Sequence, residues 1–169
     1  MKTIIRGGIL LGILVTIWTY IFGATGMHKS ATGALVFACV ATLIELVVLA
    51  WALKRTAAEG RRWIGQVSAG TLLAFVGGCL ILATSYLYMT QVNPTYMSEV
   101  REAGVAALRA QGLDDAAIQK RMDLQAMYGT PMAQAVTGFV MTVITGFVLS
   151  AILGIFIRNK APQAAAVPV

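Results

Sequence analysis

The sequence predicts an all-α integral membrane protein: a four-helix bundle with an extramembrane αα-hairpin between its third and fourth helices. The first observation is a set of long apolar segments, at residues 5–26, 32–53, 67–90 and 133–157. A helix rises about 1.5 Å per residue, so about 20 apolar residues cross the hydrocarbon core. The second observation is the composition, 58% hydrophobic and 12% charged, where soluble domains carry about 25% charged residues. We expect one four-pass domain over residues 1–160, because a single bundle uses this length.

The third observation is the distribution of positive charge. Eight cations fall on one side of a four-pass arrangement: Lys2, Arg6, Lys54, Arg55, Arg61, Arg62, Arg158 and Lys160. Positive charge is retained on the cytoplasmic face of a membrane, which places both termini in the cytoplasm. The net charge of +6 therefore indicates orientation in a lipid bilayer and no nucleic-acid partner.

The first span, residues 5–26, follows a basic start and could be taken for a signal peptide. Secretory apolar regions are about 7–15 residues long, and this uncharged stretch is longer. We therefore expect a retained membrane anchor.

Small residues recur every four positions along the spans. Lipid tails are as apolar as leucine, so membrane helices associate through close backbone approach, which small residues permit. We predict helix packing at seven glycines: Gly8, Gly12, Gly70, Gly78, Gly138, Gly146 and Gly154. The second span carries the related series Ala34, Ala38 and Thr42. The alternative is a homodimer face, above all on the last span.

The segment 94–130 has the signals of a helical hairpin outside the membrane. Asn93 followed by Pro94 is typical of a helix start, with a capping side chain before a proline at the first position. Gly112 suits the left-handed residue that ends a helix. Asp114 predicts the cap of a second helix. Neither helix has the length and apolarity to span a bilayer.

Glu45 is the ionisable side chain that lies well inside a predicted span. Thr16, Thr71, Thr145 and Ser150 lie at similar depth on the other spans and could share hydrogen bonds with it. One interpretation is a protonated, hydrogen-bonded acid that holds its helix in register. The other is a proton or cation relay, because intramembrane acids commonly mark ion pathways.

The other polar residues suggest no chemistry. His28 stands in a short loop with no Cys or acid near it in sequence, so we expect a solvated residue and no metal site. Cys39 and Cys79 lie inside spans and are expected to act as small apolar side chains. We expect no catalytic residue and no cofactor. The tail 161–169 is rich in Ala and Pro and is expected to be disordered.

Several short motifs carry a family resemblance. They are the segment 92–96 (VNPTY), the turn 111–113 (QGL) with its following acids, the exit 129–132 (GTPM), and the glycine-spaced last helix that ends in Arg158. With these motifs the chain resembles family 4199 of bacterial proteins with a domain of unknown function, which are small four-helix membrane proteins. The resemblance implies the bacterial inner membrane, and it implies no reaction or ligand.

The sequence therefore favours a non-enzymatic membrane protein that serves as an interaction or assembly subunit. Its partners would be the lipid bilayer and a second copy of the chain or another membrane protein. The alternative is a small proton- or cation-coupled transporter or channel that uses Glu45. A polar cavity that reaches Glu45 would favour the transporter, because such a protein needs a path to its intramembrane acid.

Overall fold

The computed structural model describes residues 1–30, 32–126 and 129–157, and every element in these ranges is helical. The elements are α1 (Lys2–Ala24), η1 (Met27–Lys29), α2 (Gly33–Ala58), α3 (Trp63–Leu87), η2 (Tyr88–Val92), α4 (Tyr96–Ala110), α5 (Asp115–Ala126) and α6 (Pro131–Phe156). The predicted all-α class is confirmed. The predicted disordered tail and the cations Arg158 and Lys160 lie outside the described residues.

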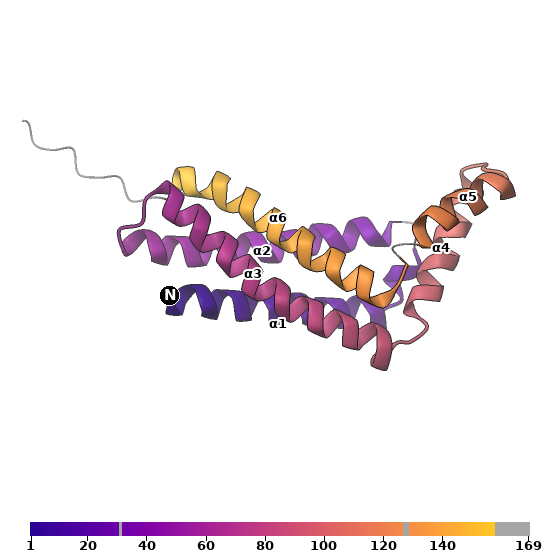
Figure 1. The fold of residues 1–169 in the computed structure, drawn as a ribbon, viewed down its shortest axis with the longest axis horizontal. Helices are drawn as coiled ribbons and strands as arrows, with labels where there is room; N and C mark the ends of the chain where they lie inside the picture. Colours follow the sequence, from indigo (N-terminus) through magenta and orange to yellow (C-terminus); the bar gives the residue numbers. More distant parts are fainter. Residues whose placement is uncertain (31, 127–128, 158–169) are drawn as a thin grey trace, which may run out of the picture.

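The helices α1, α2 and α6, and α3 together with η2, are each long and apolar enough to cross a membrane. They lie side by side, and α4 and α5 lie beyond one end of them (Figure 1). The start of α1, the connection from α2 to α3 and the end of α6 lie at the opposite end (Figure 1). The basic residues near the start of α1 and in the α2–α3 connection are therefore brought to the same end, as the charge pattern requires.

Close backbone approach holds α3 against two neighbours. On α1, a Cβ at Gly8 would lie 2.7 Å from Val76 Cβ, and one at Gly12 would lie 2.7 Å from Leu80 Cδ2. These spacings are shorter than van der Waals contact between carbons. The helices can therefore approach this closely only because these positions lack a side chain.

The contact between α3 and α6 is built in the same way. Gly70 packs on Ser150, Gly146 packs on Ala74, and a Cβ at Gly78 would lie 2.9 Å from the Phe139 ring. Gly154 packs on Trp63, whose Nε1 donates a hydrogen bond to the carbonyl oxygen of Ala151 at 3.0 Å. The second half of α6 is thus pressed closely against α3.

Gly138 differs from the other glycines that were expected to pack helices together. A Cβ at Gly138 would meet no atom within 4 Å among the described residues. The first half of α6 stands apart from α2, so this position faces a cavity. The same small-residue spacing therefore serves two purposes along one helix.

Local signals explain the segment between α3 and α6, with one correction. The predicted start of α4 at Asn93-Pro94 was wrong, because α4 begins at Tyr96. The π-helical turn η2 prolongs α3, and the amide of Asn93 still donates to the carbonyl oxygen of Tyr88 at 2.8 Å. Asn93 therefore ends the preceding helix, and Thr95 takes the position before α4.

The turn between α4 and α5 forms as the sequence predicts. Gly112 has φ +81°, and its amide donates to the carbonyl oxygen of Arg109 at 3.0 Å. The amide of Leu113 donates to the carbonyl oxygen of Leu108 at 3.3 Å, which completes a Schellman motif. The Asp114 carboxylate accepts a hydrogen bond from the Ala117 amide at 2.7 Å and caps α5.

Candidate functional site

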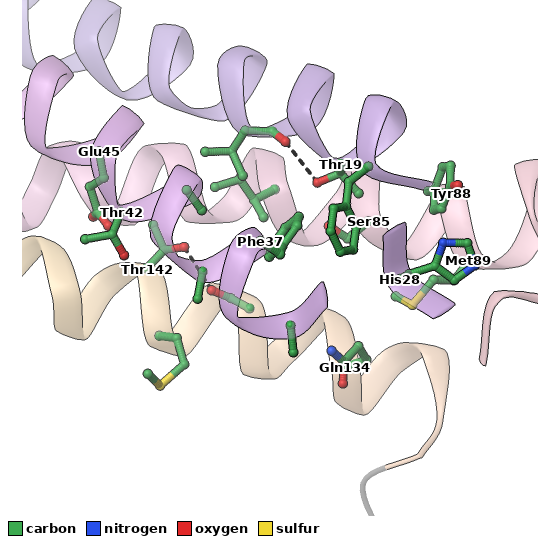
Figure 2. A pocket seen from close by; sticks show the side chains of 18 of the residues that line it. Thr19, His28, Phe37, Thr42, Glu45, Ser85, Tyr88, Met89, Gln134 and Thr142 are labelled. Carbon is green, nitrogen blue, oxygen red and sulfur yellow. Dashed lines mark hydrogen bonds between the residues drawn. The ribbon is translucent and has the colours of Figure 1, made fainter. Parts of the chain in front are cut away.

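A cavity of about 400 Å³ lies among the four long helices in the half of the protein next to α4. Its walls come from α1, α2, α3 and α6, and its outer end is covered by residues of η1, η2 and α4. Glu45, Thr42 and Thr142 lie at one end of it, and His28 and Tyr88 lie at the other (Figure 2). Most of its lining is apolar, and polar side chains lie at these two ends, along α6, and between the ends at Thr19 and Ser85.

Glu45 marks the inner end of the cavity. The residue is only 4% exposed, and its Oε1 has no hydrogen-bond partner among the described residues. A Cβ at Gly146 would lie 2.8 Å from this oxygen, so the carboxyl group fits there because α6 has a glycine opposite it. A buried polar atom without a partner is costly, and a proton or a hydrogen-bond donor at this oxygen would offset that cost.

Of the four hydroxyl-bearing residues expected around Glu45, one lines the cavity with it. Thr145 lines the same cavity. Thr16 instead shares a hydrogen bond with Thr84 at 2.8 Å, and Thr71 donates to the Val67 carbonyl oxygen at 2.9 Å. Ser150 donates to the Gly146 carbonyl oxygen at 2.5 Å.

Two other hydroxyl-bearing residues, Thr42 and Thr142, line the cavity. Thr42 was expected instead to belong to the small-residue series of the second span. Thr42 precedes Glu45 by three residues on α2, and residues three apart share one helix face. That spacing was the signal in the sequence for its place beside the acid.

Beyond Glu45 the space between the helices is closed. Leu49 and Leu53 of α2 and Leu73 of α3 are fully buried there. Farther along, the Thr56 hydroxyl donates to Gln66 Oε1 at 2.6 Å, and Gln66 Nε2 donates to the Leu53 carbonyl oxygen at 3.2 Å. The cavity therefore lies in the half of the protein next to α4 and is closed toward the end that carries the N-terminus.

His28 covers the outer end, and its prediction as a solvated loop residue was wrong. It is 7% exposed, and its Nε2 lies 2.6 Å from Glu99 Oε2. Its ring lies 4.8 Å from the Tyr96 ring between centroids. The physical reason is that α4 crosses over η1, which brings Glu99 to His28 across 71 positions of sequence. No local pattern signals such a contact.

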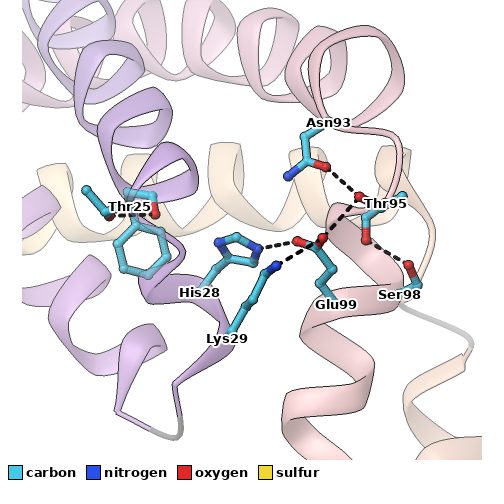
Figure 3. Close-up of polar contacts among 8 residues, drawn as sticks. Thr25, His28, Lys29, Asn93, Thr95, Ser98 and Glu99 are labelled. Atoms are coloured by element: carbon cyan, nitrogen blue, oxygen red, sulfur yellow. Dashed lines mark hydrogen bonds and ion pairs between the residues drawn. The ribbon is translucent and has the colours of Figure 1, made fainter.

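Glu99 is the hub of the polar contacts at this end (Figure 3). Besides the contact with His28, Glu99 Oε1 lies 3.2 Å from Lys29 Nζ and accepts a hydrogen bond from the Thr95 hydroxyl at 3.2 Å. The hydrogen bonds from His28, Lys29 and Thr95 lower the pKa of Glu99 from 4.5 to about 2. Desolvation by burial raises the pKa of the neighbouring Tyr96. Glu99 therefore stays charged at ordinary pH and ties α4 to η1.

The lining limits what the cavity can hold. Its ionisable groups are Glu45, His28 and the phenols of Tyr88 and Tyr96, and it has no Lys or Arg. No group of three or more His, Cys, Asp or Glu side chains in the described part of the chain is placed to hold a metal ion. The site therefore offers a hydrogen-bonding acid at the end of an apolar chamber.

One protein-family model matches nearly the whole chain. The family model described as a protein of unknown function (DUF4199) matches residues 6–159. The chain belongs to this family. The DUF4199 match includes every residue of the cavity and of the His28–Glu99 contact, so the predicted resemblance is confirmed. No curated protein and no solved structure matches the chain.

Proposed function

We propose that this DUF4199 protein is a non-enzymatic integral membrane protein that takes a cation into a cavity within a four-helix bundle and works as a small transporter. The observation that carries the proposal is the cavity that reaches Glu45, whose Oε1 has no partner among the described residues. An intramembrane acid facing a cavity is typical of ion and substrate pathways. A polar cavity was the feature expected to favour transport over assembly; the cavity that reaches Glu45 is mostly apolar, with polar side chains such as Thr42 and Thr142 in its lining.

The proposed location is the bacterial inner membrane, with the termini in the cytoplasm and the α4–α5 hairpin outside. The grouping of the basic residues at the end opposite α4 supports this orientation. The cavity would then lie in the outer half of the membrane.

The closed inner end supports a carrier instead of a continuously open channel. Leu49, Leu53 and Leu73 fill the space between Glu45 and the cytoplasmic end. A ligand that reached Glu45 from outside would need a rearrangement of α2 to continue inward. Apart from Gly33, the buried residues of α2 all lie from Glu45 onward, so the N-terminal half of this helix makes fewer buried contacts than the C-terminal half.

The test is ion flux in vesicles that contain the purified protein. A pH gradient is imposed, and internal pH is followed while inorganic and organic monovalent cations are supplied outside. We expect flux with the wild type and its loss in Glu45→Gln, which keeps the shape of the side chain. Glu59→Gln is the matched control, since Glu59 is an exposed acid at the end of α2 and outside the cavity. Absence of wild-type flux, or equal flux in Glu45→Gln, contradicts the transporter.

The assembly role expected from the sequence is the second candidate. Its support is the position of α4 and α5, which project beyond the long helices (Figure 1). A groove on α4, lined by charged residues including Arg101, Glu102 and Arg109, lies on this projecting part. A stable complex with a second copy or another membrane protein that is lost on deleting this hairpin, with no flux, would favour assembly.

A further inference from the structure

We infer that the cation taken by this cavity is an amphiphilic organic amine, with its ammonium group at Glu45 and its apolar chain along the cavity. This inference rests on the proposed function and names the class of ligand. Three observations carry it: the charge of the lining, the apolar walls, and the place where the cavity reaches the surface.

The charge of the lining selects a cation. Glu45 is the carboxyl group of the cavity, and no Lys or Arg lines it. An ionised acid in a low-dielectric site needs a partner, because an unpaired buried charge is strongly unfavourable. An ammonium group supplies both the charge and the hydrogen-bond donors that Glu45 Oε1 lacks among the described residues. An anionic ligand would place two like charges together.

The walls select an organic cation. Leu11, Val15, Phe37, Ile81 and Met141 form much of the surface between the two polar ends. Small hard cations such as Ca²⁺ take about six or more oxygen ligands, and the hydroxyls of Thr42, Thr142 and Thr145 that line the cavity with the Glu45 carboxyl group fall short of that shell. An apolar chain gains about 25 cal/mol for each Å² that it removes from water, although this gain is smaller for a molecule that comes from lipid.

The opening of the cavity indicates entry from the side. Its exposed lining residues include Ala34, Ala38 and Thr42 on α2 and Gln134 and Met141 on α6. The cavity thus reaches the surface along the seam between the N-terminal half of α2 and the first half of α6. This seam begins at the first turns of both helices, where a four-pass protein meets the lipid headgroups, and an amphiphile already lies at that depth.

The other seam of α2 is shut. The Phe37 ring lies 5.2 Å from the Phe22 ring and 6.4 Å from the Trp18 ring between centroids. Trp18 Nε1 also donates to the Phe37 carbonyl oxygen at 3.4 Å. These contacts join α2 to α1 on the side away from α6, so a ligand has one lateral route.

Glu45 is the anchor for the ammonium because it is the carboxyl group of the cavity; His28 Nδ1 also lacks a partner among the described residues, but an imidazole supplies no negative charge. His28 Nε2 is held by Glu99, and the Glu99 carboxylate is occupied by His28, Lys29 and Thr95. From Gly33 to Glu45 the helix rises about 18 Å. The ammonium at Glu45 therefore leaves an elongated apolar space for the chain of the ligand.

The test measures binding of three linear ten-carbon amphiphiles to protein in nanodiscs of neutral phosphatidylcholine, each corrected for uptake by empty nanodiscs. The three are decylamine, decanol and decanoate, which share a chain and differ in charge. We expect wild-type protein to bind decylamine at least about tenfold more tightly than decanol, a factor that corresponds to about 1.4 kcal/mol, and to bind decanoate most weakly. Glu45→Gln should bind decylamine and decanol equally, and Glu59→Gln should behave as wild type.

The possible failures are distinct. Equal binding of decylamine and decanol by the wild type overturns the preference for an amine and leaves the cavity as a ligand site. A preference for decylamine that persists in Glu45→Gln overturns the role of that residue. Absence of binding by all three overturns the proposed function together with this inference. Gly138→Phe fills the cavity from a position with no close neighbour, and unchanged binding in this variant also places the ligand elsewhere and overturns the inference.

Discussion

Alanine at two glycines of α6 should have opposite effects on stability. In Gly146→Ala the new methyl group meets the Ala74 methyl group and lies 2.8 Å from Glu45 Oε1. In Gly138→Ala it meets no atom within 4 Å among the described residues. The two variants make the same chemical change in the same helix, and they differ in whether the added group faces a wall or a cavity.

The magnitudes follow from two opposing effects. Replacing a glycine inside a helix by alanine gains about 0.5–1 kcal/mol through backbone entropy. Overpacking a well-filled contact costs about 1–3 kcal/mol, and Ala74 has no flexible side chain that could move aside. Gly146→Ala should therefore lower the free energy of unfolding by up to about 2.5 kcal/mol, the largest difference between those two ranges. Gly138→Ala should raise it by about 0.5–1 kcal/mol.

The assay is reversible unfolding of the purified protein in mixed micelles, followed by circular dichroism as the fraction of dodecyl sulfate is raised. The wild type and both variants are compared at one protein concentration and one lipid composition. Equal shifts in the same direction for the two variants would refute the reasoning, because they would show that residues 138 and 146 have the same surroundings. A loss of stability only in Gly138→Ala would refute it as well.

Three further predictions concern the polar contacts and the orientation. Because hydrogen bonds lower the pKa of Glu99 from 4.5 to about 2, its contact with His28 stabilises α4 fully above the ordinary pKa and is lost as pH falls toward 2. The protection factors of the α4 amides, which are exchange rates corrected for the intrinsic rate at each pH, should fall over that interval, and protection that does not change contradicts this. Gln66→Leu removes the partner of the Thr56 hydroxyl and should lower the free energy of unfolding by about 0.6–1.7 kcal/mol in the same assay. An unchanged unfolding midpoint would show that the contact contributes nothing to stability. Gly112→Cys in a variant without the two native cysteines should be labelled by a membrane-impermeant reagent from outside the cell, and labelling from the cytoplasmic side alone would reverse the orientation.

The sequence predicts much of the fold because its signals are local. The four apolar segments exceed the length needed to cross a bilayer, and the structure has a long helix at each. Gly112 and Asp114 occupy the turn and cap positions that their residue types favour. Asn93 shows the limit of such signals, since the π-helical turn before it competes for the same residues.

The site is harder to predict because it depends on distances between helices. Gly138 and Gly146 share one sequence pattern, and only the divergence of α6 from α2 turns one toward a cavity and the other toward Ala74. His28 and Glu99 are 71 residues apart, so nothing near either residue signals their contact. Glu45 itself could be found from the sequence, because an acid in an apolar segment is costly and therefore informative.

The central claim is that the cavity between α2 and α6 reaches the depth of Glu45 from the α4 side. Cysteine accessibility tests it most directly, because hydrophilic thiosulfonate reagents react with the thiolate and so report access to water. Thr142→Cys faces the cavity, and Ile144→Cys, two residues along the same helix, faces outward with 51% of its surface exposed in the structure. Both are made without the native cysteines, and the reagent is applied on the α4 side of membranes. The account predicts rapid modification of Thr142→Cys that Gly138→Phe suppresses, and little modification of Ile144→Cys. Equal, slow modification of both positions would contradict it.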